Sequence, residues 1–197
     1  VSSINIFPTD EHEVLKKIID GFKNFSLANI SFTNALLTKA KDTTAFLKDL
    51  NEQISKDDTA NLYVIHGTPR LDTVGIDSIS YSASFLELIS ENNFTCSLEG
   101  AFPYFEINDV IKSRIEKLGL KKVQVIPLLL VSGNHYINDM FEIKEDLEDK
   151  FEAFIVPSIT QSEQFNLIEL PMIQTFIEKN IQDSFRMMGI SHKEFTY

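Results

Sequence analysis

Two histidines and one glutamate stand where apolar runs of the sequence end. Each comes after a predicted strand: His66 after residues 62–65, Glu99 after 94–98 and His135 after 123–131. Two imidazoles and one carboxylate suit a borderline divalent ion such as zinc, cobalt, iron or nickel. An open coordination position would make such a site reactive, and the same groups can move protons near neutral pH. We therefore predict a metal site formed by these three residues.

A structural role is the alternative for each of these residues taken alone, because a histidine at a strand end commonly serves only as a hydrogen-bonding group. Their joint placement favours a site, since each has a neighbouring glycine that lets the backbone approach closely, namely Gly67, Gly100 and Gly133. The other two histidines, His12 and His192, are expected on a surface helix and in the C-terminal tail.

Short apolar runs and stretches with helical spacing alternate along the whole chain. Strands are predicted at 4–7, 62–65, 94–98, 123–131 and 154–156, and helices from residue 10 and at 33–54, 76–91, 103–118, 142–152 and 166–187, with a loop at 132–139. This order predicts an α/β fold with an open, mostly parallel sheet of about four to five strands and helices on both faces. Ligands of such sheets bind beyond the carboxyl ends of the strands.

Composition and charge exclude several classes of function. The 197 residues indicate a single domain spanning 1–197. A net charge of −11 argues against nucleic acid as a partner, and no apolar run is long enough to span a membrane. The single cysteine, Cys96, excludes an internal disulfide and is compatible with a cytoplasmic protein. No nucleotide-binding glycine motif is present.

Three segments resemble the anaerobic sirohydrochlorin cobaltochelatases, which are class II tetrapyrrole chelatases. PLLLVSGNHYINDM (127–140) is similar to the signature around the second metal-binding histidine of that family, LEGAFP (98–103) to its Val-Glu-Gly-Tyr-Pro segment, and VIHGT (64–68) to its first His-Gly-Thr turn. The resemblance is good over about residues 60–160. It implies a chelatase-like lobe, the C-terminal one of two that face each other across a cleft for the macrocycle.

The resemblance also implies roles for residues of these loops. Metal binding and proton removal carry over to His66, Glu99 and His135. Substrate binding is assigned to four neighbours, Gly67, Thr68, Gly133 and Asn134, and support of the loop to Asn138 and Asp139. The implied reaction, of the lyase type, is insertion of a divalent metal into a sirohydrochlorin-type tetrapyrrole during cobalamin or related tetrapyrrole biosynthesis. Cobalt is the first choice of metal, with Fe²⁺ or Ni²⁺ as alternatives.

Several departures from the family pattern leave alternatives open. Asn134 stands where the family has Asp, and LEGAFP carries one extra residue. The N-terminal lobe of the family has no counterpart here, so we expect either a missing partner lobe or a homo-oligomer that rebuilds the cleft. One rival function is a non-catalytic metal-, haem- or tetrapyrrole-binding protein, and a second is a structural or interaction domain. The net charge would also oppose a polyanionic substrate.

Overall fold

A computed structural model describes residues 1–131, 133–160 and 162–190, except for the side chains of 134–137. The helices are α1 (Asp10–Phe25), α2 (Ala40–Ile54), α3 (Gly75–Ile89), α4 (Tyr104–Lys117), α5 (Asn134–Glu148) and α6 (Pro171–Met187), with a short 3₁₀ helix η1 (Leu167–Glu169). The strands are β1 (Thr59–Thr68), β2 (Asn93–Gly100), β3 (Lys122–Leu128) and β4 (Glu152–Ile155). None of the helices in this described part is long and apolar enough to cross a membrane.

The four strands form one parallel sheet in the order β2-β1-β3-β4. The α/β class and the open parallel sheet are therefore confirmed. The predicted strand at 4–7 is wrong, because this segment pairs outside the sheet: Leu36 N–H donates to Asn5 O and Leu37 N–H to Ile6 O. A short apolar run does not distinguish a strand of the sheet from a segment that is buried without joining the sheet.

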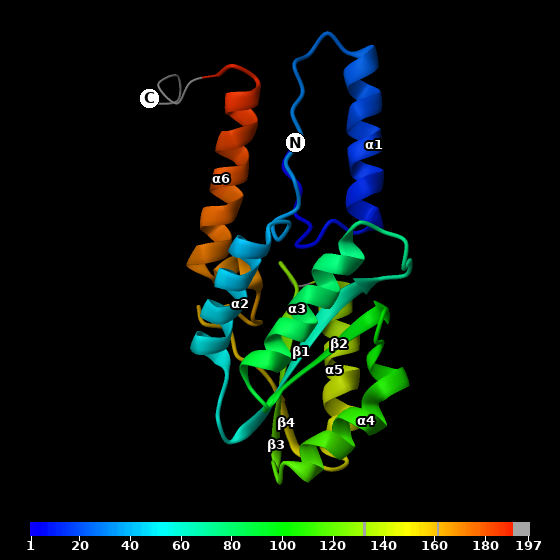
Figure 1. The fold of residues 1–197 in the computed structure, drawn as a ribbon, viewed down its shortest axis with the longest axis vertical. Helices are drawn as coiled ribbons and strands as arrows, with labels where there is room; N and C mark the ends of the chain where they lie inside the picture. The colour runs from blue at the N-terminus through cyan, green and yellow to red at the C-terminus, as the bar shows by residue number, and fades with distance from the viewer. Residues whose placement is uncertain (132, 161, 191–197) are drawn as a thin grey trace.

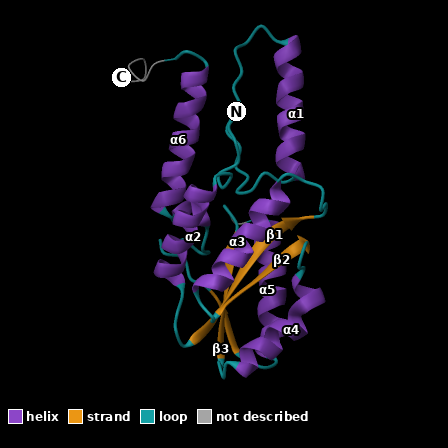
Figure 2. Ribbon diagram, in the orientation of Figure 1, coloured by secondary structure: helices purple, strands orange, loops and turns teal. Residues whose placement is uncertain are grey.

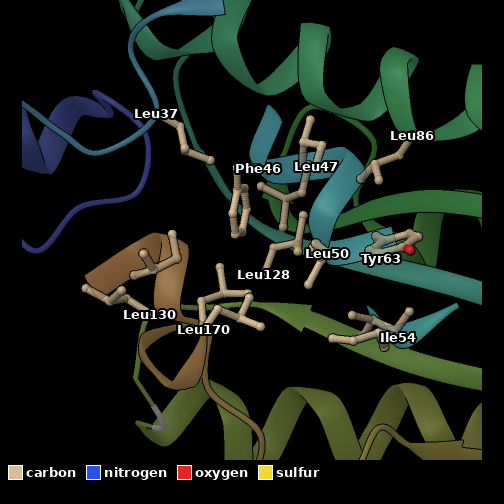
Figure 3. Close-up of a cluster of buried hydrophobic side chains, with 14 of the residues drawn as sticks. Leu37, Phe46, Leu47, Leu50, Ile54, Tyr63, Leu86, Leu128, Leu130 and Leu170 are labelled. Carbon is tan, nitrogen blue, oxygen red and sulfur yellow. The ribbon is translucent and has the colours of Figure 1, made fainter. Parts of the chain in front are cut away.

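Helices cover both faces of the sheet, and the alternation of side chains along each strand divides the core in two. On β1, Tyr63 and Ile65 join the core under α2 and α3, whereas Leu62 and Val64 join the core under α4 and α5. Figure 3 shows the first of these cores, in which residues of α2 such as Leu50 lie close to Leu128 and Leu170. Strands buried on both faces explain why the runs are continuously apolar.

Three of the predicted element boundaries are wrong around the third loop and the C-terminal region. β3 ends at Leu128 rather than at 131, because the carbonyls of Leu129 and Leu130 accept bonds from Leu167 and Ile168 instead of continuing the ladder. α5 begins at Asn134, so most of the predicted loop at 132–139 is helical. The final predicted helix is divided into η1 and α6, since Pro171 begins a new helix.

Helices α1 and α6 project from the body of the protein on the side to which β1 and β2 point (Figures 1 and 2). Two extended segments lie beside each other there, since Thr33 N–H donates to Val1 O. One face of α1 carries four exposed apolar side chains at helical spacing, Val14, Ile18, Phe22 and Phe25. The projecting part therefore presents apolar surface on the carboxyl side of the sheet.

His12 lies on the largely exposed helix α1, as expected, but its side chain does not face solvent. Its side chain is only 4% exposed, and its Nδ1 shares a hydrogen bond of 2.8 Å with Ser3 Oγ. The ring lies 5.1 Å from the ring of Phe32. Ser3 and Phe32 belong to segments that pack against α1, and the apolar spacing of the helix alone does not predict these contacts. His12 therefore ties the N-terminal segment to α1.

This burial makes a pH dependence of stability measurable. Desolvation lowers the pKa of His12, against an opposing effect of Glu13 and together with a smaller lowering effect of Lys16. Because the folded pKa lies below the unfolded one, the unfolded chain takes up the proton first. The contribution of His12 to the free energy of unfolding is therefore fully present above a pH of about 6.5, the unfolded pKa. It is lost as the pH falls through the folded pKa.

We expect His12→Gln to lower the free energy of unfolding by about 1 kcal/mol at pH 7.5, the value of one hydrogen bond. The difference between the two proteins should shrink at pH 5.5. Urea unfolding of both proteins at the two pH values measures it. If the difference in the free energy of unfolding between the two proteins did not change with pH, the lowered pKa of His12 would be contradicted.

Candidate metal and substrate site

The carboxyl ends of β1 and β2 form the centre of the candidate site. In the parallel register, Gly67 lies opposite Glu99 and Thr68 opposite Gly100. Both glycines have positive φ, 88° at Gly67 and 76° at Gly100. A Cβ at Gly67 would lie 2.0 Å from Glu99 O, and one at Gly100 would lie 1.7 Å from Thr68 O. Glycine is required at both positions because the two strand ends touch through their backbones.

This close contact brings two of the predicted metal-binding side chains together. His66 Nδ1 lies 3.6 Å from Glu99 Oε1, and also 3.5 Å from Gly67 O. Two ligands of one tetrahedral ion, each about 2.1 Å from it, are separated by about 3.4 Å. His66 and Glu99 are therefore spaced so that they can share one ion. Their side chains are 32% and 46% exposed, which leaves them open to an ion from solvent.

A cavity of about 260 Å³ opens beside His66. Most of its lining is apolar and comes from two segments, Ile4–Phe7 of the N-terminal region and Leu128–Val131 after β3. Such a cavity, apolar with few polar groups, is typical of sites for organic ligands. The cavity thus places an apolar pocket next to a side chain that can bind a metal.

Two acidic residues at the start of α1 also reach this region, and the sequence alone did not indicate them. Glu11 lines the cavity together with His66. Thr68 Oγ1 donates a hydrogen bond of 3.0 Å to Asp10 Oδ1. The hydroxyl of Thr68, predicted to bind substrate, is therefore engaged within the protein and holds the end of β1 to α1. Asp10 and Thr68 are 58 positions apart in the chain, so no local pattern relates these groups.

The third predicted ligand lies at the start of α5. Gly133 is the residue that precedes this helix, and His135 is in its first turn, beyond the carboxyl end of β3. The side chains of Asn134 and His135 lie outside the described residues, so the contact of His135 with the pair is not tested. Within the part of the chain that is described, no group of three or more metal-binding side chains occurs.

A partly buried carboxylate connects α4, which follows the loop after Glu99, with α5. Asp146 on α5 accepts hydrogen bonds from Tyr104 Oη (2.7 Å) and Asn108 Nδ2 (3.1 Å), and it pairs with Lys112 Nζ at 2.8 Å. Burial alone would raise the pKa of Asp146, but these donors lower it below its usual value. The carboxylate therefore stays charged and holds together α4, which follows the loop after Glu99, and α5, which contains His135.

Comparison with known proteins identifies the family. The profile described as cobalt chelatase (CbiK) matches residues 1–183. The chain belongs to the cobalt chelatase family. No curated protein matches it.

Solved structures similar to this cobalt chelatase family member confirm the fold. One is described as SirB from Bacillus subtilis with Fe³⁺, with a TM-score of 0.60 and 14% identity, covering 96% of this chain and 72% of that one. Another is described as the sirohydrochlorin chelatase SirB from Bacillus subtilis subspecies spizizenii in complex with cobalt, with a TM-score of 0.52 and 13% identity, covering 96% and 70%. At this identity the likeness shows the fold alone.

Proposed function

We propose that this chain inserts a divalent metal, cobalt in the first instance, into a sirohydrochlorin-type tetrapyrrole. The observation that carries the proposal is the pair of His66 and Glu99, 3.6 Å apart beside an apolar cavity. Membership of the cobalt chelatase family supports it. Fe²⁺ and Ni²⁺ remain candidate metals, since histidine and carboxylate ligands accept all three ions, and the two SirB structures contain iron and cobalt.

In the proposed reaction, the metal is a substrate that His66, Glu99 and His135 hold before transfer. Two pyrrole N–H protons must leave the macrocycle as the ion enters, and a neutral imidazole or the Glu99 carboxylate accepts them. The four nitrogens of the macrocycle then replace the protein ligands on the metal. Three protein ligands hold the ion firmly enough to displace water and still release it, unlike a closed four-ligand site.

Binding of a substrate with many carboxylates needs local compensation for the net charge of −11. The first turn of α5 contains no acidic residue, so no side-chain charge of that turn opposes the attraction of its N-terminal dipole for a carboxylate. This supports the proposed roles of Gly133 and Asn134 in substrate binding. Arg70 is less suited to this task, because its Nε and Nη2 donate to Asp72 at 2.9 and 2.7 Å.

The proposed cleft also needs a second wall. We propose that a second α/β lobe or a second copy of the chain lies on the carboxyl side of the sheet. We also propose that the protein acts in the cytoplasm. The exposed apolar stripe of α1, from Val14 to Phe25, supports a protein neighbour on that side. In either case residues 1–197 act as one lobe of the site.

The decisive experiment is metal insertion itself. The chain is mixed with sirohydrochlorin and Co²⁺, Fe²⁺ or Ni²⁺ in turn at 0.15 M salt, which screens repulsion beyond about 8 Å. We expect the absorption spectrum to change to that of the metallated macrocycle faster than in protein-free controls, with cobalt the fastest. Spectral binding without insertion would favour a carrier, and no binding of metal or macrocycle would favour a structural domain.

A further inference from the structure

Phe102 has a backbone conformation that residues with a Cβ rarely adopt. Among the residues that the structure describes, Phe102 is the only non-glycine residue with positive φ, at 64°. In this region the Cβ of an L-residue approaches a backbone carbonyl too closely. Such outliers persist only where their surroundings impose them, and they concentrate at functional sites.

Two hydrogen bonds hold the Phe102 backbone in this conformation. Ser97 N–H donates to Phe102 O at 3.0 Å, and Ser97 Oγ donates to Ala101 O at 2.6 Å. The loop after Glu99 is thus folded back onto β2. The backbone cannot relax without breaking these bonds, so the direction of the Phe102 side chain is set by the loop.

The strained conformation gives no packing advantage in the core. The side chain of Phe102 is 55% exposed, only three residues after Glu99. The other loops of this edge also present exposed apolar side chains: Leu71 and Val74 follow β1, and Val131 follows β3. A phenyl ring held in solvent, in the loop that directly follows the metal-binding Glu99, is suited to stack on a flat conjugated ligand.

We propose that the Phe102 ring packs against the flat face of the tetrapyrrole and holds the macrocycle beside His66 and Glu99. This inference rests on the proposed function and adds a residue that recognises the ring system. Phe102 has no group that binds metal or accepts protons. Its substitution therefore changes affinity for the macrocycle and leaves the dependence on metal concentration unaltered.

Substitutions at Phe102 separate the ring from the backbone conformation. Phe102→Ala is expected to raise the KM for sirohydrochlorin by about tenfold and to leave the KM for Co²⁺ unchanged. Phe102→Gly should raise the KM for sirohydrochlorin as much as Phe102→Ala does, although glycine tolerates the positive φ. Phe102→Tyr keeps the ring and should stay within about twofold of the original protein. Metal-free binding of the macrocycle, followed by absorbance, should give the same order of affinities.

Phe105 provides a matched control, because its side chain is also 55% exposed and its ring meets Tyr104 edge-on at 5.1 Å. Phe105→Ala should not change the KM for the macrocycle. An unchanged KM in Phe102→Ala, or an equal rise in Phe105→Ala, would overturn the inference. A changed sedimentation coefficient with an unchanged KM would assign the ring to a protein interface and would also overturn it.

The same measurements distinguish the failure of this inference from the failure of the proposed function. If the original protein inserts metal and Phe102→Ala does so with the same KM, only the role of Phe102 is wrong. If the original protein neither inserts a metal nor binds the macrocycle, the proposed function is wrong and the role of Phe102 with it.

Discussion

Replacing His66 with alanine is expected to lower the rate of metal insertion by a factor of about 100 or more. Loss of a residue that only orients a metal ligand already costs about 10- to 100-fold, so loss of a ligand should cost at least as much. The fold should be kept, because the side chain of His66 is partly exposed and lies at a strand end. Initial rates with Co²⁺ and sirohydrochlorin, together with circular dichroism, measure both effects.

Glu99→Gln tests whether the two side chains act on the same ion. It preserves shape and removes the charge, and we expect a similarly large loss of rate. The double variant should be little worse than either single variant, since residues that act as a unit show non-additive effects. Glu178→Gln removes the same charge at an exposed position of α6 and should have no effect on the rate of insertion. Additive losses, or full activity in His66→Ala, would refute the shared site.

Gly100→Ala is expected to damage both stability and activity. The new Cβ would lie 1.7 Å from Thr68 O and 2.6 Å from Thr68 C, and both are backbone atoms that cannot move aside locally. Strain and overpacking together should lower the free energy of unfolding by about 3 kcal/mol. Movement of Thr68 would also displace His66, so insertion should slow even where the protein remains folded. Thermal unfolding and initial rates measure the two effects.

Gly119→Ala separates the steric effect from the backbone conformation. Gly119 has a similar φ of 72°, but nothing lies within 4 Å of a Cβ there. Its substitution should cost only the conformational strain, about 1 kcal/mol, and should leave insertion unchanged. Equal destabilisation by the two substitutions would contradict the proposed contact between the strand ends.

Much of the fold follows from local patterns that the chain carries in its sequence. Strands buried on both faces are apolar throughout, and helices carry apolar residues at a spacing of three and four, so the alternating elements and the parallel sheet were predictable. The segment at 4–7 shows the limit of this reasoning. Its apolar run packs over the site rather than in the sheet, and periodicity does not distinguish these two kinds of burial.

The sequence by itself determined which residue types stand near the carboxyl ends of the strands, and hence the candidates His66, Glu99 and His135; His66 and Glu99 lie in the last residues of β1 and β2 rather than after them. The tertiary structure decided which of them meet: the glycine contact between β1 and β2 brings His66 to 3.6 Å from Glu99. It also added Glu11 beside His66 and the constrained ring of Phe102 in the Glu99 loop. The approximate positions of strands follow from the local apolar pattern, whereas exact strand ends, register, loop conformation and contacts between distant segments depend on how the whole chain packs.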